Sequence, residues 1–196
     1  MATFFIDPRI LVYPAVTLIA WTLAAGAEAA TIRGLVVSHQ GERYQISFDA
    51  EVEAPASEVF KVLSDYARLG ELSPVITSVE VKPAPDGNAE RVRSVLKTCF
   101  LIFCRQVIQV EDVTEPDRST IVARMVPGKG DFKSGYCVWR IRSDGRRTLL
   151  RYEATRTTAF WIPPLIGEWI IERTMREHLK ASVGRLETLI AKPARL

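Results

Sequence analysis

The sequence predicts an α+β fold in which a curved antiparallel sheet of seven strands wraps around one long C-terminal helix. Apolar and polar residues alternate strictly in a first segment that starts at Arg43, and strand-like segments recur up to Thr157. Two short helical segments follow the first strand, and a broad apolar stripe with helical spacing follows the last one. A sheet and a helix must each bury an apolar face, so they are expected to pack against each other.

The first strand covers residues 43–52, with Tyr44 and Phe48 on its apolar face. Pro55 ends it, and Ser57 or a near neighbour can cap the short helix that follows. A second short helix covers residues 65–69. Six further strands are predicted at 75–82, 91–98, 105–113, 120–126, 132–142 and 148–157. The connections between them are short, which favours a meander of neighbouring antiparallel strands.

The C-terminal helix is expected to start near Pro163 and Pro164. Its apolar stripe consists of Ile166, Ile170, Met175, Leu179, Val183, Leu186 and Ile190. The folded domain is therefore predicted to cover residues 43–191, with residues 30–42 as an N-terminal linker.

Residues 1–29 have the pattern of a secretory signal peptide. No charge occurs from Ile10 to Ala27, and Ala27-Glu28-Ala29 offers small residues at the two positions that a signal peptidase reads. Residues 10–27 are near the lower limit for spanning a bilayer, so an uncleaved membrane anchor is the alternative. We expect export, to the bacterial periplasm.

Composition and motifs exclude several classes of function. The chain has 196 residues, 47% of them apolar, and a formal charge of +3, which fits one globular domain. That charge is small and no basic stripe with interleaved aromatics occurs, so no nucleic-acid partner is predicted. We find no Ser-His-Asp set, zinc-ligand spacing, phosphate-binding loop or dinucleotide fingerprint. No catalytic residue, metal or cofactor is therefore assigned.

Three cysteines occur, and two of them test the strand count. Along one continuous strand Cys99 and Cys104 would lie about 16 Å apart, too far for a disulfide. Across a hairpin with four residues between them they would face each other and could be bonded. The alternative is two reduced core cysteines. Cys137, inside a predicted strand, is expected to be a buried small apolar residue.

Three apolar connections are predicted to lie at one end of the sheet, because alternate connections of a meander share an end. They are residues 100–103, 127–130 and 160–167, and residues 71–74 lead into the second strand at the same end. We call this end the rim; its candidate residues are Phe100, Leu101, Ile102, Phe103, Lys129, Phe160, Trp161 and Ile162. Basic residues flank it, namely Lys97, Arg105, Lys129, Lys133 and Arg156. Apolar side chains beside cations are typical of a membrane-surface contact. The alternative is that residues 100–103 continue a buried strand and the Trp161 segment packs onto the sheet.

The element order resembles that of the START-like, or SRPBCC, superfamily. The motifs that carry the resemblance are Glu51-Val-Glu-Ala-Pro55, Val59-Phe60, Asp65-Tyr66 and Trp139-Arg-Ile141. The sequence is most similar to the polyketide cyclase/dehydrase and lipid-transport group that includes coenzyme-Q-binding proteins. The resemblance implies a helix-grip fold with an apolar cavity between sheet and helix. It implies no particular reaction, because the superfamily has no universal catalytic signature.

We therefore predict a protein that binds and transfers a hydrophobic small molecule, such as a lipid, an isoprenoid or a polyketide-like compound. The candidate cavity residues are Tyr44, Phe48, Met125, Tyr136, Trp139, Tyr152, Ile170, Met175 and His178. One alternative is a cyclase or dehydratase in which His178 acts as general acid or base. Another is a non-catalytic module that presents the rim to a protein partner.

Overall fold

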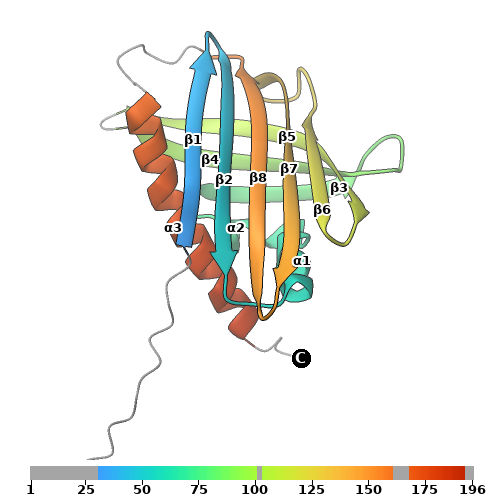
Figure 1. Cartoon of the computed structure of the whole chain (residues 1–196). Coiled ribbons are helices and arrows are strands. Elements are labelled where there is room, and N and C mark those ends of the chain that lie inside the picture. The colour runs from blue at the N-terminus through green and yellow to red at the C-terminus, as the bar shows by residue number, and fades with distance from the viewer. Residues whose placement is uncertain (1–30, 101–102, 161–167, 193–196) are drawn as a thin grey trace, which may run out of the picture.

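A computed structural model describes residues 31–192 except 101–102 and 161–167, and these form one curled sheet and a long helix (Figure 1). The strands are β1 (Thr31–Gln40), β2 (Arg43–Val52), β3 (Ile76–Pro83), β4 (Glu90–Phe100), β5 (Phe103–Asp117), β6 (Thr120–Met125), β7 (Phe132–Asp144) and β8 (Arg147–Thr158). The helices are α1 (Ala56–Leu63), the 3-10 turn η1 (Tyr66–Arg68), α2 (Leu69–Leu72) and α3 (Glu168–Ala191). The expected α+β helix-grip architecture is confirmed.

All neighbouring strands are antiparallel, and their order across the sheet is β1-β2-β8-β7-β6-β5-β4-β3. In Figure 1, β3, β4 and β5 run across the view behind β1, β2 and β8, so the sheet curls strongly. The long helix α3 lies beside β1 and also contacts β2, β4, α1 and α2. Sheet and helix thus enclose an interior between them.

The sheet has eight strands in the described residues, and not the seven that the sequence predicted. Residues Thr31–Gln40, expected to be part of a linker, pair with β2 from Thr31↔Glu51 to Gln40↔Arg43. The pairing shifts register between Arg33 and Val36, around Gly34 at φ 60°. This bulge breaks the alternation of apolar residues and leaves only Leu35 and Val37 buried, which is why the strand escaped notice.

Helix α1 begins without the expected side-chain cap. Pro55 precedes its first residue with extended backbone (φ −62°, ψ 143°), and no side-chain oxygen, including that of Ser57, caps the helix. The proline already fixes φ at the turn, so the chain enters the helix without Ser57. Val59 and Leu63 are buried on its inner face, and α1 contacts α3.

The core is built from the inner faces of the strands and one stripe of α3. Phe48, Val52 and Leu150 are almost fully buried, as are Val183 and Leu186 from the helix. Burying a side chain of this size contributes roughly 1.5–3 kcal/mol to folding. The helix therefore stays against the sheet through its own apolar stripe.

The rim is the end of the sheet where β8 leaves toward α3. Backbone hydrogen bonds link the segments that meet there: Thr158 N donates to Glu42 O (3.1 Å) and Ala159 N to Asp131 O (2.9 Å). Asp131 N donates in turn to Ile108 O (2.8 Å) on β5. The β1–β2 connection, the β6–β7 connection and Ala159, at the end of β8, thus adjoin.

Candidate functional site

Three aromatic side chains form the centre of the inner sheet face. The ring centroids of Trp139 and Tyr152 lie 4.5 Å apart, and those of Phe48 and Tyr152 lie 5.0 Å apart. Phe48 meets the edge of Trp139 at 5.7 Å. Strand register explains the cluster, because Tyr152 is paired with Phe48 on one side and with Trp139 on the other.

A buried polar cluster lies on the same face, next to these rings. Arg156 on β8 donates to Gln109 Oε1 and, over 3.2 Å, to the Tyr152 hydroxyl. Gln109 Nε2 donates to Glu111 Oε2 at 2.5 Å. Arg156 Nη2 lies 3.4 Å from Glu111 Oε1, with only 16% and 10% of the two side chains exposed. We refer to Gln109, Glu111, Tyr152 and Arg156 as the polar cluster.

Two features of the sheet let Arg156 on β8 reach β5. Strand β6 ends at Met125, so the start of β7 lies directly beside β5 at this level, through the bond between Asp131 and Ile108. Arg156 is paired with Gly135 on β7, which presents no side chain in its path. A Cβ at Gly135 would lie only 2.5 Å from Thr155 O and 3.3 Å from Met125 Cγ, so the close packing requires glycine.

The surroundings of the polar cluster keep Arg156 charged, and they keep the Tyr152 hydroxyl and the nearby Cys137 thiol neutral. Burial lowers the pKa of Arg156, but Tyr152 and Glu111 raise it further, so the guanidinium stays protonated. Burial raises the pKa of the Tyr152 hydroxyl above its usual range. Burial, aided by the charge of Glu111, raises the pKa of the nearby Cys137 thiol to about 11. The cluster thus holds one cation and one buried carboxylate, Glu111.

One atom of this cluster lacks a hydrogen bond. Glu111 Oε1 is buried and accepts none from any described residue, although the Arg156 guanidinium stands 3.4 Å away. The arginine compensates its charge, but the geometry leaves its lone pairs unused. Such a group costs about 1–3 kcal/mol relative to a satisfied one, so it is the unsatisfied acceptor of the cluster.

Several of the predicted cavity residues do face the interior. Phe48, Met125 and Tyr152 are buried on the inner sheet face, while Tyr44 and Trp139 face inward and stay partly accessible. Met175 and His178 lie partly buried on α3, and burial lowers the pKa of His178 below its usual value. The side chain of Ile170 lies outside the described residues.

Tyr136 was wrongly assigned to the cavity. It is 47% exposed on the outer face of β7 and lines a shallow groove of about 490 Å³ with Val122 and Val138. Tyr136 and Trp139 are three positions apart on one strand, so alternation puts them on opposite faces. The inward set on β7 is Cys137, Trp139 and Ile141.

At the rim, aromatic and basic side chains lie together. The Arg105 guanidinium stands 4.3 Å from the centroid of the Phe160 ring, which also meets the Phe132 ring at 6.3 Å. Lys133 forms an ion pair with Glu42. Trp169, in the first turn of α3, is 66% exposed and was not among the predicted rim residues.

Other rim predictions need correction or cannot be placed. Arg156 was expected to flank the rim as a surface cation, but it points inward to the polar cluster because it alternates with the outward Thr155 and Thr157. Lys129 lies in the β6–β7 connection, exposed as expected. Leu101, Ile102, Trp161 and Ile162 lie outside the described residues, as do the side chains of Phe100 and Phe103.

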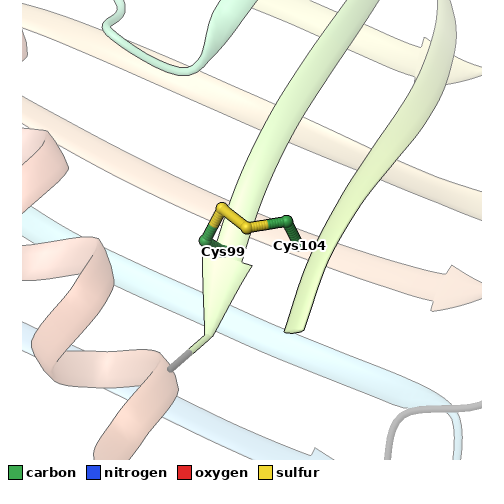
Figure 2. Close-up of a disulfide and its surroundings, with 2 residues drawn as sticks. All are labelled: Cys99 and Cys104. Atoms are coloured by element: carbon green, nitrogen blue, oxygen red, sulfur yellow. A yellow bond between two sulfur atoms is a disulfide. The ribbon is translucent and has the colours of Figure 1, made fainter. Parts of the chain in front are cut away.

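The Cys99–Cys104 disulfide is present and joins directly paired residues of β4 and β5 (Figure 2). The register continues to Phe100↔Phe103, so these residues belong to a hairpin and not to one continuous strand. Both cysteines are exposed, whereas Cys137 is free and buried. A disulfide persists in oxidising compartments, which agrees with export.

The described residues contain neither a candidate metal site nor a candidate membrane-spanning helix. No group of three or more His, Cys, Asp or Glu residues there could hold a metal ion. None of the helices in that part of the chain is long and apolar enough to cross a membrane. The predicted signal peptide at 1–29 and the alternative anchor at 10–27 lie outside it.

Comparison with known proteins assigns the family. A family model described as polyketide cyclase/dehydrase and lipid transport matches residues 43–191, which is most of the chain. The chain belongs to this family. No curated protein matches it.

Several solved structures share the fold of this chain. A START superfamily protein from Mycobacterium smegmatis is 21% identical, with a TM-score of 0.59 over 74% of this chain and 98% of its own. The Zhui aromatase/cyclase from Streptomyces sp. R1128 is 18% identical, with a TM-score of 0.57 over 79% and 99%. A fragment of a STAR-related lipid transfer protein from Xanthomonas axonopodis is 16% identical, with a TM-score of 0.56 over 81% and 99%. At these identities the likeness establishes the helix-grip fold.

Proposed function

We propose that this family member binds a hydrophobic small molecule between the inner face of its sheet and α3. The observation that carries the proposal is a set of apolar side chains that face the interior and yet are only partly buried: Tyr44, Ile46, Trp139, Met175 and Leu179. A close-packed core leaves few voids beside its apolar groups. Inward apolar surface that protein atoms leave uncovered is the surface that an apolar ligand would cover.

The polar cluster supports this proposal. Small-molecule sites are mainly apolar, with a few fixed polar groups that orient the ligand. Arg156, Gln109 and Tyr152 hold one another by hydrogen bonds, so their positions are set before a ligand arrives. A lipid, an isoprenoid or a polyketide-like compound combines an apolar body with a polar group in the way that this interior requires.

We further propose that the protein exchanges its ligand at a membrane through the rim. Phe160 and the exposed Trp169 offer aromatic surface, and Arg105 and Lys129 offer positive charge. Aromatic side chains favour the bilayer interface, and basic ones are attracted to anionic head groups. Together with the disulfide and the signal-like leader, this favours a carrier that works in the periplasm.

Transfer between vesicles tests the proposed function. Delipidated protein is incubated with donor vesicles made from a bacterial lipid extract, re-isolated, extracted with organic solvent and assayed by mass spectrometry. The proposal predicts a bound lipid that passes to acceptor vesicles. Protein that returns empty, and binds no lipid from any donor mixture, would reject the carrier.

A second candidate is a cyclase or dehydratase, favoured by ionisable groups held in an apolar interior. Arg156, Glu111 and Tyr152 form such a group, and perturbed pKa values accompany catalytic sites. Turnover of a polyketide-like substrate that stops on Arg156→Met, while the circular dichroism spectrum stays native, would favour it over the carrier. An empty, inert protein that captures a protein partner through the rim would instead favour the interaction module.

A further inference from the structure

We propose that the polar end of the ligand is an uncharged hydroxyl that donates a hydrogen bond to Glu111 Oε1. This inference rests on the proposed binding of a hydrophobic molecule in the interior, and it specifies the chemical class of that molecule as an apolar alcohol. It begins from a buried carboxylate oxygen that accepts no hydrogen bond from the described residues.

The hydrogen bonds within the polar cluster show that a donor to Glu111 Oε1 is missing. The guanidinium of Arg156 donates to Gln109 and to Tyr152. The amide of Gln109 donates to Glu111 Oε2, which occupies the first oxygen of the carboxylate. The second oxygen, Oε1, retains only the ionic contact at 3.4 Å. A ligand that completes the network must therefore bring a donor.

The charges of the cluster then select among donors and acceptors. Arg156 and Glu111 compensate each other, and Glu111 is the one buried carboxylate in the described part of the chain. A ligand carboxylate or phosphate would place a second negative charge beside Glu111. A ligand ammonium group would place a second positive charge beside Arg156. A neutral hydroxyl adds no charge, so among these groups it alone satisfies Oε1 without disturbing the pair.

The Oε1 atom itself is buried, but the two side chains of the pair are not completely covered by protein atoms. Glu111 and Arg156 keep 10% and 16% of their side-chain surface, and the partly accessible Tyr44 is paired with Arg156 on β2. The terminal torsion of a glutamate is broad, so a small rotation of the carboxylate turns Oε1 from the guanidinium toward a ligand.

Competition between matched ligands tests the inference without any variant. The protein is loaded with Nile red, an uncharged fluorophore, and the dye is displaced by dodecanol, by ionised dodecanoate or by the methyl ether of dodecanol. A hydrogen bond to a charged acceptor corresponds to roughly ten- to hundred-fold in affinity. We expect dodecanol to bind at least about ten-fold more tightly than either competitor. Equal affinities, or a preference for dodecanoate or the ether, would overturn the inference.

Two variants at neighbouring positions test whether Glu111 causes the preference for dodecanol. Glu111→Gln removes the buried negative charge, so Arg156 becomes uncompensated and the preference should shift toward dodecanoate by about ten-fold or more. Asp112→Asn makes the same chemical change on the outer face, where Asp112 pairs with Arg91 at 2.7 Å, and should leave the preference unchanged. An unaltered preference in Glu111→Gln, with a native circular dichroism spectrum, would contradict the assignment of Glu111.

The failure of this inference can be told apart from the failure of the proposed function. If Nile red binds and all three competitors displace it equally, the interior binds apolar molecules but Glu111 does not select a hydroxyl. If neither the dye nor any competitor binds, the binding function itself fails, and the inference fails with it.

Discussion

Arg156 Nη2 on β8 lies 3.4 Å from Glu111 Oε1 on β5, although two other strands lie between β8 and β5 in the sheet. The early end of β6 and the absence of a side chain at Gly135 make this contact reachable. A buried ion pair is weak evidence for stability, since desolvation offsets much of the attraction. The pair lies beside apolar side chains that are only partly buried, where we have proposed that a ligand binds.

Removing one partner of this pair should destabilise the protein strongly. Arg156→Met leaves Glu111 buried without a counter-charge, and we expect a loss of about 3–5 kcal/mol in the free energy of unfolding by urea. The double variant Arg156→Met with Glu111→Met should recover most of that loss. Arg140→Met, which breaks an exposed pair with Glu153, should cost less than about 1 kcal/mol. A mild effect of Arg156→Met, equal to that of Arg140→Met, would contradict the burial of the pair.

The stability of the protein should fall in alkaline solution, in part because of Cys137. Burial raises the pKa of this thiol from 9.0 to about 11. The folded state holds the proton more tightly than the unfolded chain, so the free energy of unfolding falls as pH rises from about 9 to about 11. The raised pKa of Tyr152 acts in the same direction at higher pH.

Cys137→Ala isolates the contribution of the thiol. The variant should lose part of the slope of unfolding free energy against pH, most clearly near about pH 9, below the pKa of about 10 at which unfolded tyrosines titrate. Urea unfolding at a series of pH values measures this slope. A slope that is identical in the variant and the wild type would show that Cys137 titrates normally.

Thiol counting tests the hairpin. Oxidised protein that is unfolded without reductant should present one thiol, Cys137, to Ellman's reagent, and three after reduction. The disulfide closes a small loop, so Cys99→Ser with Cys104→Ser should lower stability by only about 2 kcal/mol. Three thiols before reduction would rule out the bond and remove its support for export.

Binding to anionic vesicles tests the rim. Arg105→Glu removes the cation that lies over Phe160 and adds a repelled charge, so affinity for phosphatidylglycerol vesicles should fall by about ten-fold. Arg146→Glu makes the same change in the β7–β8 turn, at the opposite end of the sheet, and should bind as the wild type does. The replacement of both Phe100 and Phe103 by Ser should weaken binding further. Equal losses of affinity for Arg105→Glu and Arg146→Glu would mean that the net charge of the protein, and not the rim, determines binding to the vesicles.

The sequence predicted the structure best where apolar and polar residues follow a regular period. Alternation, turn residues and the apolar stripe of α3 were sufficient to predict seven of the eight strands that the structure describes, the helix-grip architecture and the inward placement of Phe48, Trp139 and Tyr152. The cysteine spacing predicted a hairpin that the pairing confirms. Strand β1 was missed because its bulge interrupts the pattern, although Gly41 between β1 and β2 offered a turn signal.

The polar cluster could not be predicted, for a physical reason. On β5 both faces carry apolar residues, since Val107 and Val113 alternate with Ile108 and Val110. Alternation then does not reveal which face Gln109 and Glu111 share, and a carboxylate is expected to face solvent. The contact between Glu111 and Arg156 depends on the curl of the sheet and the end of β6, which are properties of the fold as a whole.

Native mass spectrometry of a matched pair of helix variants tests the central claim most directly. Leu179→Trp adds a large ring to the interior face of α3, where the wild-type side chain is partly accessible, and Lys180→Trp adds the same ring to the exposed face. After incubation with a bacterial lipid extract, the wild type and Lys180→Trp should carry a lipid adduct, and Leu179→Trp should be empty although folded. Equal adducts on both variants, or none on the wild type, would contradict a ligand held between the sheet and α3.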